Sequence, residues 1–315
     1  MAWKKNLTQE EKAAYHEKKQ SEMQDLFKKI DEGVRAVFES EKYKEYLSVM
    51  AKFTNYSARN CMLIALQKPD ATLVAAYGKW KQLGRQVEKG QTGIRILAPM
   101  PYKIINEEAS ENEEQEEAEG IAFKVISVFD VSQTSGKELP TIINELDGEI
   151  NPEQKKAILR AVQKAVGIPI EFEDIPGHAK GYYSSSEKRI VIKTGMSDTQ
   201  TLKTLLHEAG HALLHNPDLE IATVKSSRSE KEIQAESIAF IVATKLKIAD
   251  TSEYSFPYIA SWSQGKPLET LNKFLSEIQS AARTLTDAIE TELHSLNEEQ
   301  SESEEEIPVF SAISM

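Results

Sequence analysis

The sequence predicts an α+β protein of two domains, a basic α+β module followed by a mainly helical domain with a small β-hairpin or sheet. The chain has 315 residues, about twice the roughly 150 residues of a typical single domain. Its hydrophobic share of 40% and charged share of 28% are typical of a soluble globular protein. Charge divides the chain, because residues 1–105 carry 19 Lys and Arg against 12 Asp and Glu, whereas the remainder carries 19 against 38. The two halves therefore present different surfaces.

Helical patterns open the first domain. Residues 8–40 are rich in Glu, Lys, Gln and Ala and predict one long amphipathic helix. After a second short helix, Asn55 or Ser57 caps a third helix, which ends before Pro69. Apolar residues at helical spacing mark one face of the first helix, namely Met23, Leu26, Phe27, Ile30, Val34 and Phe38.

Strands complete the first domain. Gly84, Gly90 and Gly93 punctuate a turn that leads into a strand at residues 94–97. Residues 106–120 contain eight glutamates and almost no apolar residue, so they predict a solvated loop. The apolar, β-branched segment IAFKVISVFDV follows at once. The acidic stretch is therefore predicted to be an insertion between two strands of a domain that spans residues 1–145.

The second domain is predicted at residues 150–296. Gly, Ser and Pro cluster in SQTSGKELP, and a new helix begins at Pro152. GYYSSSEKRIVIKTG predicts a hairpin with its turn near Ser184–Glu187. Three helices follow, approximately at 198–215, 229–247 and 267–296. The acidic residues 297–315 are predicted to form a disordered tail.

The sequence also indicates a compartment. Cys61 is the single cysteine and cannot form an internal disulfide, which favours a reducing environment. The N-terminus has no apolar stretch behind its lysines, and about 18 consecutive apolar residues occur nowhere. We therefore expect a cytoplasmic protein with no membrane partner.

The run HEAGH predicts a metal site on a helix. His207 and His211 stand four residues apart, so they share a face with an axial offset of about 6 Å. One tetrahedral Zn²⁺ can bind both and still take a third protein ligand and a water. Glu208 flanks this face and is predicted to be the catalytic general base for that water. The alternative is a chance run on an ordinary amphipathic helix.

The third ligand must come from another segment. His215 lies about 12 Å along the axis from His207, which is too far for all three imidazoles to reach one ion. Glu232 and Glu236 stand four apart on the next helix and could supply one ligand and one hydrogen-bond acceptor for a ligating histidine. The alternative is an exposed acidic face. Two imidazoles and a carboxylate suit zinc best, although manganese or cobalt can occupy the same ligands.

A basic surface is predicted in the first domain. Residues 52–103 hold nine Lys and Arg against only Asp70 and Glu88. Such a surface attracts phosphates, and the interleaved aromatic residues are of the types on which unpaired bases stack. These aromatic residues are Phe53, Tyr56, Tyr77, Trp80 and Tyr102. The alternative is a solvated charged face with a buried aromatic core.

The motifs of the second domain carry a family resemblance. HEAGHALLH, followed some 25 residues later by an AE pair, resembles the glutamate-zincins, including the ImmA/IrrE peptidases. The stretch from GYYSSSEKRIVIKTG through EIQAESIAFIV resembles the C-terminal peptidase domain of ArdC-type antirestriction proteins. The resemblance implies Glu236 as the third zinc ligand, with Glu232 in the second shell.

The first domain extends this resemblance over roughly residues 10–140. FTNYSARN, the pair of Trp80 with the following GR, and VEKGQTGIRILAP resemble the N-terminal single-stranded-DNA-binding domain of ArdC and of LtrC-like proteins. Ala76, near which a glycine is expected, and the acidic insertion depart from the pattern. The resemblance implies that single-stranded DNA contacts Asn55, Tyr56, Ser57, Arg59, Asn60, Trp80, Lys81, Arg85 and Lys89.

Together these features predict a zinc metallopeptidase that binds single-stranded DNA and acts on a protein or peptide substrate. The resemblance implies an antirestriction role that protects the DNA of a mobile element. Two alternatives stand beside it, a repressor-cleaving regulatory protease of the ImmA/IrrE kind and a non-enzymatic DNA-binding protein with a structural zinc. The oxyanion-stabilising residue is unassigned, with His178, Tyr182, Tyr183 and Tyr258 as candidates.

Overall fold

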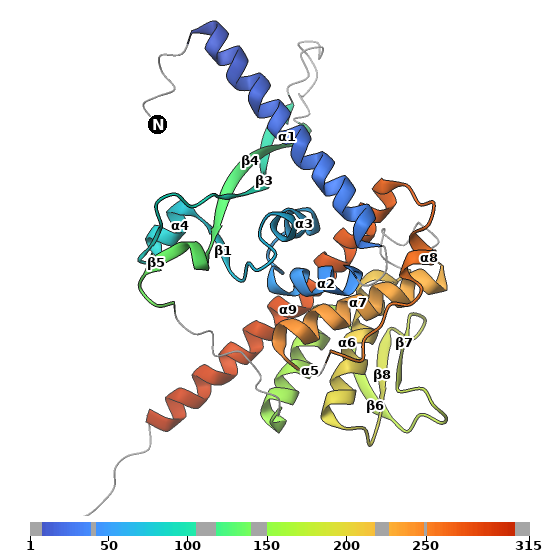
Figure 1. The fold of residues 1–315 in the computed structure, drawn as a ribbon. Coiled ribbons are helices and arrows are strands. Elements are labelled where there is room, and N and C mark those ends of the chain that lie inside the picture. Colours follow the sequence, from blue (N-terminus) through green and yellow to red (C-terminus); the bar gives the residue numbers. More distant parts are fainter. Residues whose placement is uncertain are drawn as a thin grey trace, which may run out of the picture. The chain divides into compact units, whose positions relative to one another are not determined.

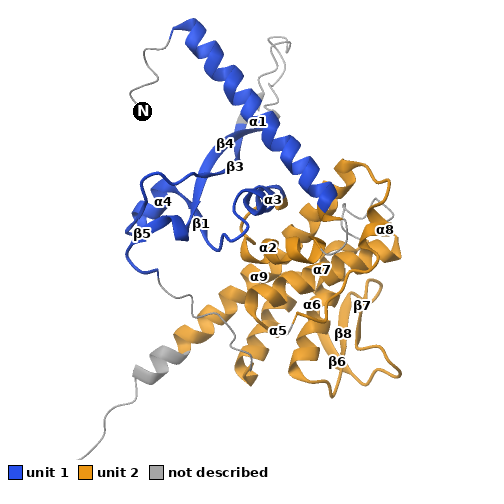
Figure 2. Cartoon of the chain, viewed as in Figure 1, with its two compact units in different colours: residues 1–36, 59–139 blue, residues 37–58, 140–315 orange. Residues whose placement is uncertain are grey.

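The computed structural model confirms the α+β class (Figure 1). It describes residues 8–38, 42–104, 118–139, 150–217, 227–248 and 251–305. The chain divides into two compact units (Figure 2). Unit 1 comprises residues 1–36 and 59–139, and unit 2 comprises residues 37–58 and 140–315. The predicted boundary at residues 140–152 falls largely on residues 140–149, which lie outside the described ranges.

The two longest described helices of unit 1 are α1 (Gln9–Val37) and α3 (Ala58–Gln67). Helix α1 places Leu26, Ile30 and Val34 in the core, as its apolar spacing predicts. Helix α3 buries its apolar residues from Cys61 to Ile64. Gly33 permits a close approach, because a Cβ there would lie 2.7 Å from Sδ of Met62.

The main sheet of unit 1 is antiparallel with strand order β1-β4-β3. Its strands are β1 (Val74–Ala76), β3 (Ile94–Ile104) and β4 (Ala118–Asp130). The pairing of β3 with β4 runs from Ile94 opposite Val128 to Ile104 opposite Ala118. The acidic stretch therefore joins two paired strands, and its residues 105–117 lie outside the described ranges. The remaining elements are α4 (Tyr77–Gln82), β2 (Arg85–Val87), the 3₁₀ turn η2 (Val131–Gln133) and β5 (Thr134–Gly136), which pairs with β2.

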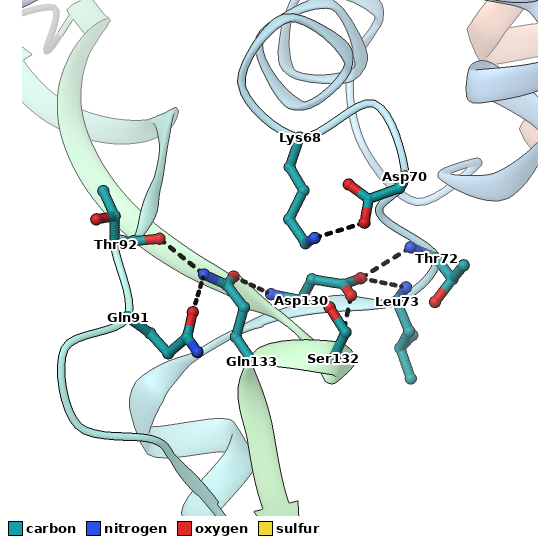
Figure 3. A network of polar contacts seen from close by, with 9 residues as sticks. All are labelled: Lys68, Asp70, Thr72, Leu73, Gln91, Thr92, Asp130, Ser132 and Gln133. Carbon is teal, nitrogen blue, oxygen red and sulfur yellow. Dashed lines mark hydrogen bonds and ion pairs between the residues drawn. The ribbon is translucent and has the colours of Figure 1, made fainter.

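A buried carboxylate braces this sheet (Figure 3). Asp130, at the end of β4, accepts hydrogen bonds from the backbone N–H groups of Thr72 (2.8 Å), Leu73 (3.0 Å) and Ser132 (3.0 Å). Its own N–H donates to the amide of Gln133, which in turn donates to the carbonyl of Thr92. The side chains of Asp130 and Gln133 thus hold together the approach to β1, the turn before β3 and the end of β4.

Asp130→Ala is expected to destabilise unit 1 by about 2–4 kcal/mol, because three amides lose their acceptor in a buried site. Hydrogen exchange of the β1 and β4 amides measures this loss. The matched control is Asp70→Ala, whose exposed carboxylate pairs with Lys68 and should contribute little to stability because solvent screens the pair. Equal effects of the two substitutions would contradict the bracing role.

The same carboxylate makes unit 1 sensitive to acid. Burial alone would raise the pKa of Asp130, but hydrogen bonds from Ser132, Thr72 and Leu73 outweigh it and hold the pKa below its ordinary value of 3.8. A carboxyl group with a lower pKa in the folded state stabilises the fold above its unfolded pKa. This contribution is therefore lost as the pH falls below about 4.

Residues 37–58 belong to unit 2, although the sequence places them in the first domain. Helix α2 (Lys42–Lys52) buries Tyr43, whose hydroxyl lies 2.8 Å from Oγ of Ser237. The amide of Gln279 donates to the carbonyls of Phe53 (3.1 Å) and Tyr56 (3.1 Å). The amphipathic pattern of α2 predicts a buried face but cannot identify the element that covers it, and here that element is α7.

The sheet of unit 2 has the order β6-β8-β7, with β6 parallel and β7 antiparallel to β8. The predicted hairpin is confirmed, because Ser184 pairs with Arg189 across its turn. Strand β7 is an edge strand of this described sheet. The strands are β6 (Ile170–Glu173), β7 (Gly181–Ser184) and β8 (Arg189–Lys193).

The described part of unit 2 contains five further helices, namely α5 (Pro152–Val166), α6 (Asp198–Leu214), α7 (Arg228–Leu246), α8 (Ile259–Ser263) and α9 (Leu268–Glu305). The predicted disordered tail is wrong for residues 297–305, because α9 continues through Glu305. These residues are rich in glutamate, a good helix former, and they extend a helix already nucleated by packing. Residues 306–315 lie outside the described ranges. None of the helices in the described chain has the length and apolarity needed to cross a bilayer.

Candidate metal centre

The candidate site lies where α6 packs against α7 (Figure 1). A Cβ at Gly210 would lie 3.0 Å from Cα of Ala235, so the small residues at these two positions allow the backbones to approach closely. The side chains of Ser197 and Ser227 cap the two helices at their N-termini. The close packing of α6 on α7 places the histidine face of α6 opposite the carboxylate face of α7.

Three donor atoms form a triangle at this crossing. Nε2 of His207 lies 3.2 Å from Nε2 of His211 and 3.4 Å from Oε2 of Glu232, and the last two atoms are 3.8 Å apart. Tetrahedral zinc with bonds of roughly 2.0–2.1 Å separates its ligand atoms by about 3.3–3.4 Å. The donor set and its spacing therefore fit one metal ion.

Glu236 lies on the other edge of the His207 ring. Its Oε2 is 3.0 Å from Nδ1 of His207, where it can accept the ring N–H. The carboxylate of Glu232 approaches both Nε2 atoms, whereas that of Glu236 meets Nδ1, so these distances favour the reverse of the two roles that the resemblance implied. Helical spacing could not distinguish them, since the two residues are one turn apart on the same face.

The carboxylates concentrate negative charge at this point. Burial would lower the pKa of His207, but hydrogen bonds to Glu232 and Glu236 outweigh it and raise the pKa to about 10. The pKa of Glu232 is lowered in return, chiefly by its hydrogen bond with His207. Burial and the positive charge of His207 lower the pKa of His211 to about 4. Such a site favours a positive charge between the rings and Glu232.

Glu208 is the carboxylate beside the triangle. It is 8% exposed, and burial raises its pKa, which the charge of His207 and the backbone N–H of Tyr183 partly oppose. Its side chain lines a cavity of about 440 Å³ together with His207, Glu236 and Gly181. A buried base that opens on a cavity next to a metal site can take a proton from a bound water.

The four predicted oxyanion donors differ in their position relative to the cavity. His178 lines the cavity, whereas Tyr182 and Tyr258 are exposed and do not line it. Tyr183 contributes its backbone N–H to Glu208. Tyr254 was missed, although it lines the cavity, is 5% exposed and has a hydroxyl without a hydrogen-bond partner among the described residues. Its only sequence signal is an aromatic segment between two helices.

The predicted DNA-contacting residues are divided between the two units. Asn55, Tyr56 and Ser57 belong to unit 2, and the other six belong to unit 1. Asn60 is buried and exchanges two 2.9 Å hydrogen bonds with the backbone of Leu97, so it supports the fold rather than a DNA surface.

Trp80 and Arg85 also have structural partners. Trp80 is 0% exposed and donates to the carbonyl of Phe129, so its indole cannot stack on a base. Arg85 is half-buried and donates to the carbonyls of Thr134 and Lys137. The predicted residues of unit 1 with exposed side chains are Arg59, Lys81 and Lys89.

Two family models match separate parts of the chain. Residues 14–129 match the N-terminal domain of the anti-restriction factor ArdC. Residues 163–260 match the IrrE N-terminal-like domain of the M78 peptidases, and this segment contains all the residues of the donor triangle. The resemblance predicted from the motifs is thereby confirmed for both domains.

Comparison with individual proteins gives one curated relative and a set of solved structures. The Bacillus anthracis protein pXO2-81 is 28% identical over 298 residues, which cover 83% of this chain and 50% of the relative, so the chain spans about half its length. The metal-free structure of antirestriction protein ArdC from plasmid R388 aligns with a TM-score of 0.49 and 22% identity over 76% of this chain and 84% of that one. The Mn(II)-bound structure of the same protein aligns with a TM-score of 0.45 and 22% identity over 76% and 86%.

Proposed function

On the premise that the chain joins an ArdC-type N-terminal domain to an M78 peptidase-like domain, we propose that it is a zinc-dependent peptidase with a module that binds single-stranded DNA. Its role would be antirestriction, the protection of the DNA of a mobile element. The match of residues 14–129 to the N-terminal domain of the anti-restriction factor ArdC supports this role.

The observation that carries the enzymatic part is the donor triangle with Glu208 beside it. Two imidazole nitrogens and one carboxylate oxygen form the ligand set of a catalytic zinc site, which keeps a fourth position for water. We assign His207, His211 and Glu232 as the ligands. Glu236 accepts the Nδ1–H of His207, which leaves Nε2 of that ring with its lone pair towards the triangle.

Bound zinc would polarise the scissile carbonyl and lower the pKa of a water. Glu208 would accept the proton of that water and later deliver it to the leaving amine. The raised pKa of Glu208 suits both steps, because a base that must also act as an acid works best near the operating pH. The half-open cavity gives a peptide access to this carboxylate.

Strand β7 offers a place for an extended peptide. Within the described residues β7 pairs as a strand with β8 alone, so it is an edge strand of the kind to which an extended peptide can add. The backbone N–H of Tyr183 already bonds to Glu208, so an added peptide would pair with the rest of this edge. Gly181 of this strand lines the cavity that contains Glu208. A Cβ at Gly181 would lie 2.7 Å from Cγ2 of Thr204, so the glycine allows the strand to lie close to α6.

Elemental analysis of the purified wild type and of His207→Ala tests the proposal. About one zinc per chain is expected in the wild type and almost none in the variant, because two protein ligands hold zinc poorly. Single-stranded-DNA binding on the same preparations should persist in the variant. If the wild type took up no zinc, the proposed peptidase activity would be contradicted, and only the proposed DNA binding would be left.

Salt dependence tests the DNA-binding module. Affinity for an oligothymidine strand should fall steeply with salt, and removing two phosphate contacts should lower the slope of log K against log salt by about 1.4. The variant is Lys81→Ala with Lys89→Ala, since both side chains are exposed in unit 1. The control is Lys156→Ala with Lys164→Ala on α5, which should leave the slope unchanged. Equal slopes in all three proteins would argue against this surface.

A further inference from the structure

A row of polar side chains leads away from the metal-facing edge of His211. Nδ1 of His211 lies 2.9 Å from Nδ1 of His215, and Nε2 of His215 lies 2.9 Å from Oε1 of Gln234. Nε2 of Gln234 donates to Oε2 of Glu277 at 2.9 Å. These four residues, here termed the His211 relay, come from the region of α6, from α7 and from α9. Only the packing of the three helices brings them together.

The carboxylate end of the relay sets the direction of every bond in it. Glu277 accepts from the amide nitrogen of Gln234, so the amide oxygen faces His215. An amide oxygen can only accept, and Nε2 of His215 therefore carries a proton. In a neutral ring the other nitrogen, Nδ1, then has a free lone pair. That lone pair must accept from His211, so the proton of His211 lies on Nδ1.

The consequence appears on the opposite edge of the His211 ring. Its Nε2 is left with a lone pair, and this atom lies 3.2 Å from Nε2 of His207 within the donor triangle. Only an unprotonated ring nitrogen can bind a metal ion. The relay thus selects the one neutral tautomer of His211 that can act as a ligand through Nε2.

We infer that His215, Gln234 and Glu277 are positioning residues, which hold His211 with its Nε2 lone pair directed at the metal. The inference rests on the metal site of the proposed function. Gln234 is 2% exposed, so a reversed amide could not replace its lost partners with water. The ring of His207 is oriented by Glu236 alone, whereas that of His211 depends on His215 at the end of its own helix and on Gln234 and Glu277 from α7 and α9.

Two variants of the full-length chain test the relay. Gln234→Met keeps the volume but removes both hydrogen bonds, and it should raise the zinc dissociation constant about 10- to 100-fold. The double variant Gln234→Glu with Glu277→Gln keeps every donor and acceptor direction, because the introduced carboxylate accepts from His215 and from the introduced amide. It should restore most of the affinity. The control Thr286→Val removes a buried hydroxyl of α9, bonded to its own helix, and should bind zinc as the wild type does.

Nitrogen-15 spectra of the histidine rings in the metal-free proteins give a second readout, which needs neither zinc nor activity. The relay predicts His211 protonated on Nδ1 in the wild type and in the double variant, and a mixture of tautomers in Gln234→Met. A proton on Nε2 of wild-type His211, or unchanged zinc affinity in Gln234→Met, would overturn the inference. A wild type that binds no zinc would instead overturn the proposed function, and the spectra would still decide the relay.

Discussion

Glu208→Gln is expected to lower peptide hydrolysis by about 10²- to 10⁴-fold while zinc binding is retained. Glutamine keeps the shape of the side chain but cannot take the proton of a water at neutral pH. Glu208 is outside the donor triangle, so its replacement should not remove a ligand. The measurement is cleavage of a proteome-derived peptide mixture by zinc-loaded protein, with single-stranded DNA present and absent, followed by mass spectrometry.

The control for this substitution is Glu153→Gln, an exposed carboxylate in the first turn of α5. It should cleave as the wild type does. If Glu208→Gln and the wild type gave the same products at the same rate, Glu208 would not be the base. If zinc-loaded wild type cleaved nothing and Glu208→Gln changed neither zinc content nor stability, the zinc would be a structural ion in a non-enzymatic protein.

Glu232→Ala is expected to lose zinc far more completely than Glu236→Ala. Removing a ligand should weaken zinc binding more than about 100-fold, whereas removing an acceptor behind a ligating histidine typically costs about 10- to 100-fold. This ranking of the two losses in zinc affinity follows from two distances. Oε2 of Glu232 lies 3.4 Å from Nε2 of His207, whereas Oε2 of Glu236 lies 3.0 Å from Nδ1 of the same ring. Competition with a chelator measures both dissociation constants.

Glu236→Gln separates the two roles further. The amide oxygen of glutamine can still accept the Nδ1–H of His207, so this variant should keep most of the zinc affinity. A carboxylate that ligates the metal could not be replaced in this way without a large loss. Zinc retained by Glu232→Ala and lost by Glu236→Gln would restore the assignment that the family resemblance implied.

Much of the fold could be predicted because it depends on local pattern. The apolar spacing of α1, the β7–β8 hairpin and the strands on either side of the acidic stretch all follow from periodicity and turn residues. The extension of α9 and the transfer of residues 37–58 to unit 2 did not follow from it. The transfer depends on which surface covers the amphipathic helix α2, and that surface, α7, is distant in sequence. The extension of α9 instead reflects glutamate-rich residues that continue a helix already held by packing.

Exposure was the least predictable property of the DNA-binding candidates. Asn60 and Trp80 are residue types that bind nucleic acids, yet both are buried and bonded to backbone carbonyls. A polar or aromatic side chain inside a basic segment has the same letter in the sequence whether it faces the core or the solvent. Only Arg59, Lys81 and Lys89 of the unit 1 candidates keep exposed side chains.

The sequence by itself determined that His207 and His211 share one face of a helix with Glu208 beside it, because they are four residues apart. Only the tertiary structure decided which carboxylate completes the donor set. That choice depends on how α7 crosses α6, which the contact of Gly210 with Ala235 sets. The tautomer of His211 is likewise a tertiary property, since its proton is placed by hydrogen bonds that end on α9. The pair of histidines is therefore a local property of the sequence, whereas the choice of the third donor and the orientation of the rings are properties of the packed helices.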